Sequence, residues 1–278
     1  MARKPKFPSY SVLMSVYYKE NPEWLKISIN SMLKQTAFPS EFVLVEDGPL
    51  TDELDKVIEK YQKKYKDLFK IVKLKTNQGL GPALKIGVEN CTNEYIARMD
   101  SDDYSIPTRC EKELEKIVED NDLDIVGSNV AEFIDNIENV QAYRMLPETN
   151  EDIHKYAKRR NPFGHPSVML RKSKVIEAGN YREYYLCEDY DLWLRMIEKG
   201  AKCYNFKEIL VYMRVSPDFY KRRGGIKYLK SILKFKTEQF KKKRFKFGDY
   251  VISSCASIVA CLCPNVVREF IYKKLLRK

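Results

Sequence analysis

The sequence lacks the cysteine patterns on which small disulfide-bonded proteins and zinc modules depend. Its 278 residues include seven cysteines, but these form no CxxC pair and no regular spacing. We therefore interpret them as reduced and mostly structural thiols. Cys261 and Cys263 are close in sequence, yet two thiols without further ligands do not make a metal site. Histidine is scarce as well, and His154 lies in a polar helical stretch that suggests no role.

The sequence also has no apolar run long enough to span a bilayer. The first residues, MARKPKFPSY, are basic but lead into no apolar stretch of signal-peptide length, so we expect the body of the chain to stay in the cytoplasm. Residues 250–263 are apolar, but these 14 residues precede Pro264 and fall short of the roughly 20 that a spanning helix needs. We expect a re-entrant or interfacial helix there, with a helix packed on the protein itself as the alternative.

Excess positive charge is missing from most of the chain. The net charge is +11, yet residues 216–278 hold 17 Lys and Arg against 4 Asp and Glu, which leaves about −2 for residues 1–215. The basic tail favours an anionic partner, either a membrane or a nucleic acid, and the larger part reads as a near-neutral domain. Hydrophobic residues make up 44% and aromatic residues 12% of the chain, which indicates a globular fold.

Alternating strand and helix patterns predict an α/β fold. Apolar runs of strand length stand at Tyr10 to Val16, Phe42 to Val45, Phe69 to Leu74, Tyr95 to Met99 and Asp124 to Ser128. Helical spacing appears in residues 22–35, in the stretch with Leu54, Val57, Ile58 and Tyr61, and in residues 80–90 and 107–121. This alternation predicts a mainly parallel, doubly wound sheet, in which ligands bind beyond the carboxyl ends of the strands.

The alternation fails after residue 130. Short strands are predicted at 131–134, 168–170 and 210–213, with a helix at 190–199. We expect this part to form a mixed extension that supplies the far wall of the same cleft. The chain then divides into an α/β domain, residues 1–215, and a basic helical tail, residues 216–278.

Residues 97–104, ARMDSDDY, place three carboxylates at the end of a predicted buried strand. A solvated loop with an Asp capping the helix after Pro107 is one reading. A calcium EF-hand fails, because Ser105 stands at loop position six, where Gly is needed. The carboxylates suit Mg2+ or Mn2+, which takes one or two of them and completes its shell with substrate and water. The cluster therefore predicts a phosphorylated ligand.

Three further sites each allow two readings. Residues 46–49, EDGP, form a turn, or Asp47 accepts hydrogen bonds from a nucleobase or ribose. The acidic residues at 188–191 stabilise a helix start through the macrodipole, or one of them is a general base on the far wall of the cleft. His165, between Gly164 and Pro166, is a solvated loop residue or lies near the phosphate or the acceptor.

The order of these motifs resembles glycosyltransferase family 2, which has the GT-A fold, and most closely its amylovoran-type exopolysaccharide subgroup. The residues that carry the resemblance, within 10–214, are SVLMSVYYKE (11–20), LVEDGP (44–49), NQGLGPALKIG (77–87), ARMDSDD (97–103), NPFGHPSVMLRKSKV (161–175) and EDYDLWLRM (188–196). The resemblance implies a Rossmann-like, mainly parallel sheet flanked by helices, and inverting transfer from a nucleotide sugar.

The resemblance also implies roles for residues on the donor side. Val16, Tyr17 and Glu20 would line the nucleoside pocket, and Asp47 would recognise the base. Asp100 and Asp102, with Ser101 between them, would form the DxD element, in which Asp102 binds the metal and Asp100 points toward the ribose.

One departure from the family pattern affects the donor side. Many members have Arg-Asn before the glycine of the third motif, whereas this chain has Leu84-Lys85 before Ile86-Gly87. Lys85 or Arg98 is the candidate substitute for that arginine.

On the acceptor side the resemblance makes Asp189 the catalytic base, with His165 and Glu188 beside the acceptor or the phosphates. Asp189 would deprotonate an acceptor hydroxyl, which attacks the anomeric carbon, while Mn2+ or Mg2+ at Asp102 neutralises charge on the leaving diphosphate. The implied donors are UDP-galactose, UDP-glucose or a UDP-N-acetylhexosamine. The implied acceptor is a lipid-linked saccharide of surface polysaccharide biosynthesis.

The expected location is the cytoplasmic face of the cell membrane. There the tail, with Lys241-Lys242-Lys243-Arg244 beside an apolar helix, would bind anionic lipid. A sugar-nucleotide pyrophosphorylase is the alternative enzyme, but residues 16–20, VYYKE, are not the Gly-rich phosphate loop that it needs. A nucleic-acid-binding protein is the alternative of another class. It is disfavoured because the positive charge is confined to the tail, so we expect no nucleic acid as partner.

Overall fold

A computed structural model describes residues 7–216 and 224–270 of the chain. The first half alternates strands and helices: β1 (Tyr10–Val16), α1 (Pro22–Leu33), β2 (Glu41–Glu46), α2 (Asp52–Lys64), β3 (Phe69–Lys73), α3 (Leu80–Asn90), β4 (Tyr95–Asp100), β5 (Tyr104–Ser105) and α4 (Arg109–Glu119). The helix starts follow local chemistry, since Asn21 and Thr51 cap α1 and α2 with their side-chain oxygens. This confirms the predicted alternation.

The second half departs from simple alternation, as expected. Its elements are β6 (Leu123–Phe133), β7 (Val140–Arg144), α5 (Asn150–Ala157), a 3-10 turn (His165–Ser167), β8 (Met169–Arg171), α6 (Lys172–Glu177), α7 (Glu188–Glu198), β9 (Lys202–Arg214), α9 (Gly225–Lys241), α10 (Phe247–Leu262) and α11 (Asn265–Phe270). The two strands expected at 124–128 and 131–134 are one strand, β6. β6 stays paired with its neighbour β9 along its whole length, with register shifts in the pairing on both sides of Asn129.

All the strands form one sheet, in the order β3, β2, β1, β4, β8, β6, β9, β5, with β7 paired to β6. β3, β2, β1, β4, β6 and β9 run in one direction, and β8, β5 and β7 run against them. The mainly parallel sheet is therefore confirmed. Register brings Val16 level with Glu46 and Ser15 level with Asp100, so β1, β2 and β4 end at one edge.

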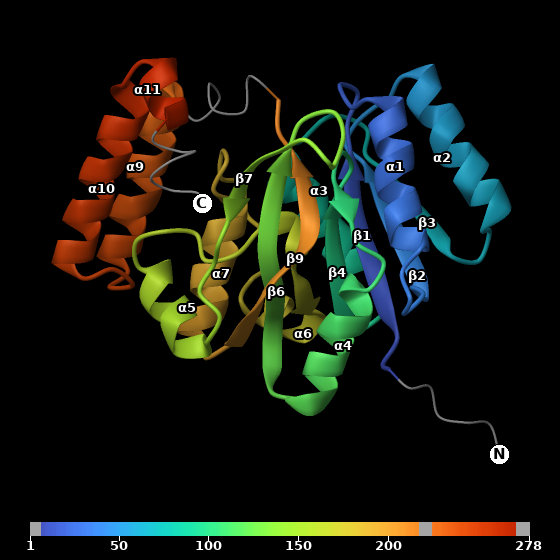
Figure 1. The fold of residues 1–278 in the computed structure, drawn as a ribbon, viewed down its shortest axis with the longest axis horizontal. Helices are drawn as coiled ribbons and strands as arrows, with labels where there is room; N and C mark the ends of the chain where they lie inside the picture. Colours follow the sequence, from blue (N-terminus) through green and yellow to red (C-terminus); the bar gives the residue numbers. More distant parts are fainter. Residues whose placement is uncertain (1–6, 217–223, 271–278) are drawn as a thin grey trace.

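Helices cover both faces of this sheet (Figure 1). Along β1 the side chains alternate, so that Val12 and Met14 pack with α1, α2 and α4, while Leu13 packs with α3 and α7. A strand buried on both faces reads as a continuous apolar run, which is why β1 was predicted with its observed bounds.

The basic tail, within its described residues, forms α9, α10 and α11 (Figure 1). Residues 217–223, the first part of the helical stretch expected from residue 218, lie outside the described residues. α9 packs on α7, where Phe235 and Ile232 join Tyr190 and Leu194 in one hydrophobic cluster. Among residues 7–216 and 224–270 no helix is both long and apolar enough to cross a membrane.

Candidate active site

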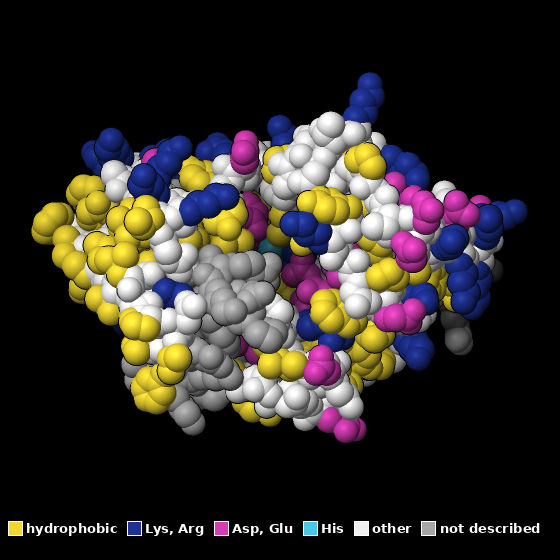
Figure 2. Space-filling view, turned by 90° about the horizontal axis from the view of Figure 1, so that it is seen from above, with side chains coloured by type: hydrophobic (Ala, Val, Ile, Leu, Met, Phe, Trp, Pro, Cys, Tyr) yellow, Lys and Arg dark blue, Asp and Glu magenta, His cyan; other side chains and the backbone are white. Residues whose placement is uncertain are grey.

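The acidic cluster lies at the carboxyl end of β4. Oxygen atoms of Asp100, Asp102 and Asp103 lie within 4.8 Å of one another. β4 ends at Asp100 and the chain turns at once into β5, which brings the three side chains together. Figure 2, viewed onto the upper side of Figure 1, shows a hollow there in which Asp and Glu side chains gather.

Asp103 is anchored differently from its two neighbours. It is 1% exposed, and its Oδ1 accepts a 2.7 Å hydrogen bond from the backbone N–H of Arg214, while Oδ2 has no partner among the described residues. Burial, followed by the charges of Asp102 and Asp100, raises the pKa of Asp103 well above its ordinary value. Asp103 therefore ties the cluster to the end of β9.

Asp102 lies among other carboxylates. Burial, with Asp100 and Glu20 nearby, raises the pKa of Asp102 to about 8. A cluster of carboxylate oxygens whose negative charges disfavour one another suits a hard divalent cation, because the cation neutralises those charges. Asp102, with Asp100 beside it, therefore suits Mn2+ or Mg2+.

Arg214 supplies the positive charge that touches this cluster on the β9 side. Its Nε donates to the backbone carbonyl of Asp102 at 3.0 Å, and its guanidinium lies over the rings of Trp24 and Phe133 at 4.6 and 4.5 Å. Sequence reasoning missed this residue, although it directly follows the strand expected at 210–213.

The segment after β1 borders the cluster on another side. Glu20 accepts a hydrogen bond from the Ser101 hydroxyl, and burial is the largest cause of its raised pKa. Tyr17 and Tyr18 are 39% and 48% exposed and meet edge to face at 5.8 Å, whereas Val16 is buried. Glu20 and Ser101 are thus brought together with the Asp cluster, and Tyr17 offers an exposed ring.

Asp47 organises the turn before α3. It is 3% exposed, and its two carboxylate oxygens accept the backbone N–H groups of Gln78 at 2.7 Å and Gly79 at 3.0 Å. The next residue is Gly48, with φ of +87°, where a Cβ would meet the backbone nitrogen of Asn77 at 2.5 Å. The predicted contact of Asp47 with the base stays a prediction.

Lys85 and Arg98, the two candidate substitutes for the missing arginine, lie in different surroundings. Lys85 is exposed on α3 and lines a cavity of about 510 Å3 together with Gln78, Tyr181 and Arg182. Arg98 is 1% exposed and pairs through Nη2 with Asp100, while its Nε and Nη1 have no partner among the described residues. Arg98 is therefore the one held at the acidic cluster.

The far wall is the first turn of α7. The Oδ2 of Asp189 accepts a 2.6 Å hydrogen bond from the Asn161 amide, and its Oδ1 accepts the backbone N–H of Tyr190 at 2.7 Å. Burial raises the pKa of Asp189, and burial followed by the charge of Asp189 raises that of Glu188 to about 8. Burial also lowers the pKa of His165 well below its ordinary value, so this ring is neutral, and it contacts the Tyr181 hydroxyl at 3.1 Å.

Arg98 links the two walls. It is ion-paired with Asp100, and its positive charge also opposes the rise in the pKa values of Asp189 and Glu188 that burial causes. Asn161 and Arg144 were missed as site residues. The charge of Arg144 lowers the pKa values of Asp189 and His165, and its guanidinium donates to the Asn161 carbonyl at 2.9 Å. Asn161 stands inside a recognised motif, whereas Arg144 ends β7, a strand that the sequence did not reveal.

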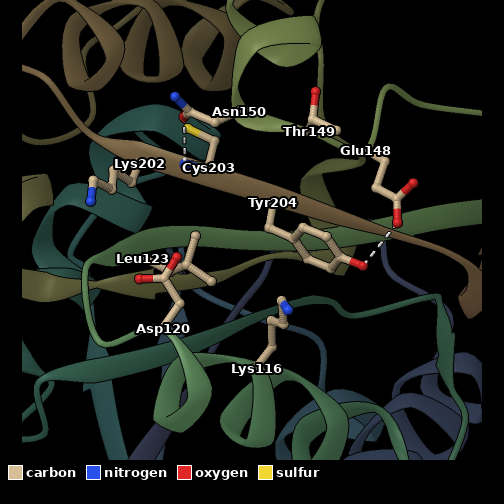
Figure 3. Close-up of a pocket in the computed structure, with 9 residues that line it drawn as sticks. All are labelled: Lys116, Asp120, Leu123, Glu148, Thr149, Asn150, Lys202, Cys203 and Tyr204. Carbon is tan, nitrogen blue, oxygen red and sulfur yellow. Dashed lines mark hydrogen bonds between the residues drawn. The ribbon is translucent and has the colours of Figure 1, made fainter.

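A second cavity lies at the opposite edge of the sheet, where β6 and β9 begin (Figure 3). Its volume is about 580 Å3, and its lining includes Lys116, Glu148, Lys202 and Tyr204. None of the predicted site residues lines it. The candidate site is therefore the hollow at the carboxyl edge.

Comparison with known proteins decides what kind of site this is. The model of the family described as Glycosyl transferase family 2 matches residues 11–179. The chain belongs to glycosyltransferase family 2. Its resemblance to the amylovoran-type subgroup, predicted from the motifs, is thereby confirmed along with its class as an enzyme.

Two relatives match this family 2 glycosyltransferase over nearly its full length. An Escherichia coli protein, UDP-Gal:alpha-D-GlcNAc-diphosphoundecaprenol beta-1,3-galactosyltransferase, is 36% identical over 98% of both chains. The amylovoran biosynthesis glycosyltransferase AmsE of Erwinia amylovora is 36% identical over 95% of this chain and 98% of its own.

The fold matches that of a solved GT-A enzyme. The S. aureus TarS structure in complex with UDP-GlcNAc aligns with a TM-score of 0.59 and 18% identity, covering 96% of this chain and 74% of that one. The predicted GT-A fold is confirmed. The carboxyl edge of the sheet therefore presents this enzyme's candidate active site.

Proposed function

We propose that this enzyme transfers a hexose or N-acetylhexosamine from a UDP-sugar to a saccharide carried on a polyprenyl diphosphate, with inversion at the anomeric carbon. The observation that carries the proposal concerns Arg98, a buried cation. It is ion-paired with Asp100 on β4, and its charge also lowers the pKa of Asp189 on α7. Two acidic groups near one buried cation suit a reaction that needs a donor diphosphate on one side and a base on the other.

The relatives support the choice of donor and acceptor. The E. coli relative is named for UDP-Gal and a diphosphoundecaprenol-linked GlcNAc, and TarS was solved with UDP and with UDP-GlcNAc. We extend both to this chain as a proposal. Surface polysaccharide biosynthesis, as in the amylovoran relative, is the corresponding process.

On the acceptor wall, Asp189 takes the proton from the attacking hydroxyl. Its raised pKa makes it a stronger base than an ordinary Asp, and the Asn161 amide and the Tyr190 backbone N–H fix the orientation of its carboxylate. The hydroxyl oxygen forms the new bond to the anomeric carbon as the bond to the diphosphate breaks. An α-linked donor then gives a β-linked product.

On the donor wall, Asp102 would hold Mn2+ or Mg2+ with Asp100 beside it. When bound, the cation neutralises charge that develops on the leaving diphosphate. Tyr17, Asp47 and Glu20 place the nucleoside, Ser101 holds Glu20 in position, and Lys85 and Arg98 supply positive charge toward the phosphates. Glu188 and His165 border the acceptor. These roles are proposals for the positions described above.

A donor-binding experiment tests this function. UDP with Mn2+ should raise the melting temperature, and Asp102→Ala should remove that rise. Asp189→Asn should keep the rise while lowering transfer at least about 100-fold, since it removes only the base. A panel of UDP-sugars then identifies the donor. Normal transfer by Asp189→Asn would exclude Asp189 as the base, and an unchanged UDP shift in Asp102→Ala would exclude the metal site.

The location follows from the acceptor. A polyprenyl diphosphate lies in the membrane, so the enzyme works peripherally at the cytoplasmic face, with residues 1–215 as the catalytic domain and residues 216–278 as its attachment.

A further inference from the structure

The outer surface of the C-terminal helices carries no charged side chain along α10. Every exposed residue of α10 is apolar or small, and its single charged residue, Asp249, is bonded to Arg159 at 2.6 Å. Phe247 is 70% exposed and Val259 60%. We define the apolar face as the exposed large hydrophobic residues of α10 and α11: Phe247, Val251, Ile252, Ile258, Val259, Leu262, Val266, Val267 and Phe270.

The opposite side of α10 is already occupied. It packs on α9, whose Lys236 is buried and donates from Nζ to the Ser257 hydroxyl at 2.6 Å and to the Ser253 carbonyl. Cys261 joins Phe235 of α9 in the cluster with α7. Packing within the protein therefore accounts for the inner side and leaves the apolar face outward. Figure 2 shows hydrophobic side chains gathered at that end of the molecule.

Exposed lysines stand directly before this face. Lys241 at the end of α9 is exposed, as are Lys242, Lys243 and Lys246 between α9 and α10, while Arg244 is bonded to Glu198 at 2.9 Å. A second copy of the chain would bring another tail with 17 basic against 4 acidic residues to the same surface, and the two would repel. An anionic bilayer surface instead matches both the apolar face and the lysines.

We infer that the apolar face is a membrane-binding surface, on which α10 and α11 lie in the plane of the interface and the adjacent lysines contact anionic lipid headgroups. α10 has 16 residues, about 24 Å of helix, which suits lying along a bilayer better than crossing it. This names the contact surface of the peripheral location proposed above.

The same helices hold the wall that carries Asp189. The Ser231 hydroxyl of α9 donates to the Tyr185 carbonyl at 3.0 Å, and the Tyr184 hydroxyl bonds Glu238. Tyr184 and Tyr185 directly precede α7, so α9 fixes the segment that leads into the base. Figure 2 shows the acidic hollow and the hydrophobic end of the molecule from one side. A membrane bound at the apolar face is therefore connected, through the packing of α10 on α9 and of α9 on α7, to the wall that carries the proposed base for a lipid-linked acceptor.

Vesicle binding by the full chain tests the inference without any sugar transfer, so its failure is distinguishable from failure of the proposed reaction. The probes are phosphatidylcholine vesicles with and without phosphatidylglycerol, analysed by flotation. Wild type should bind the anionic vesicles, and binding should fall at high salt. Ile252→Glu with Val259→Glu, and separately Lys241, Lys242 and Lys243 all changed to Gln, should each weaken binding at least about tenfold.

Val118→Glu is the matched control, because Val118 is 58% exposed on α4, away from the apolar face. It should bind vesicles like wild type. Circular dichroism and the UDP-induced melting shift check that the variants fold. Unchanged vesicle binding by both the Ile252→Glu with Val259→Glu variant and the triple Lys→Gln variant would overturn the inference. A second result would also overturn it. If light scattering shows that the wild type is a dimer, and Ile252→Glu with Val259→Glu makes it a monomer without loss of vesicle binding, then the apolar face binds a second copy of the chain.

Discussion

Asn161 donates a 2.6 Å hydrogen bond from its side-chain amide to Oδ2 of Asp189. The two residues are 28 positions apart and come from different segments, the loop before the 3-10 turn and the first turn of α7. The bond stabilises the ionised carboxylate, and so opposes the rise in pKa that burial causes at Asp189. Asn161 therefore positions the proposed base and favours its ionised form.

Asn161→Ala should move the acid limb of the transfer pH profile to higher pH. Without the donated hydrogen bond the pKa of Asp189 rises further, so a smaller fraction of the base is ionised along the acid limb, and kcat should fall about tenfold there. Activity should recover as the pH is raised. Asn150→Ala, which removes an amide that accepts the backbone N–H of Cys203 at the opposite edge, is the control. A loss of stability with an unmoved acid limb would show that Asn161 is only structural.

Arg214→Lys should weaken Mn2+ binding by roughly tenfold or more. The planar guanidinium of Arg214 lies over the rings of Trp24 and Phe133 while its Nε donates a hydrogen bond to the Asp102 carbonyl. A lysine ammonium cannot make both contacts in this geometry. Titration of Mn2+ followed by electron paramagnetic resonance measures the affinity without turnover. Arg171→Lys is the matched control. Arg171 likewise donates to a backbone carbonyl, that of Leu123, and lies over an aromatic ring, that of Tyr95, but at the opposite edge of the sheet. Equal Mn2+ affinity of wild type and Arg214→Lys would refute the role.

Gly81→Ala should lower activity by displacing the segment before α7. A Cβ at Gly81 would meet the Arg182 carbonyl oxygen at 2.5 Å and Cβ of Glu188 at 3.4 Å. Overpacking of this kind costs about 1–3 kcal/mol and outweighs the gain in helix propensity. Denaturant unfolding and donor turnover measure both effects. Gly248→Ala is the control, because its Cβ would meet nothing within 4 Å, and it should be neutral or stabilising.

The sequence revealed the elements whose apolar patterns are local. β1 and α3 have the predicted bounds, because a continuous apolar run and a helical period are local signals. β5, β7 and α6 were missed. β5 has two residues, and β7 has only Ala142 buried, so neither carries a clear pattern of its own. β5 is placed by its pairing with β9, and β7 by its pairing with β6. Such pairing depends on residues that are distant in the sequence.

The same distinction applies to the site. The carboxylates at 100–103 and 188–189 were predicted because strand ends and helix starts can be read locally. Arg144 and Arg214 reach the site only because β7 and β9 are placed in the sheet by distant partners. The resemblance also gave Asp47 a contact with the base, but spacing could not show that both its oxygens accept backbone N–H groups of the turn before α3.

Glu113 should make the protein lose stability as the pH rises from about 4.5 to about 7. It is fully buried on α4, its Oε1 accepts a 3.0 Å hydrogen bond from Arg109, and its Oε2 has no partner among the described residues. Burial raises its pKa from 4.5 to about 7, although Arg109 opposes that rise. Because the folded pKa exceeds the unfolded one, its contribution is fully present below about pH 4.5 and is lost as pH rises through the folded value.

A shift of this size corresponds to about 3 kcal/mol. Glu113→Gln keeps a hydrogen-bond acceptor for Arg109 but cannot ionise, so its unfolding free energy should decline less than that of wild type between about pH 5 and pH 8. Glu119→Gln is the matched control, because Glu119 is exposed on the same helix and should leave the wild-type pH dependence unchanged. Urea unfolding at both pH values gives the free energies. Parallel declines for wild type and Glu113→Gln would mean that this carboxylate does not change its protonation across that range, and that burial next to Arg109 does not set its pKa.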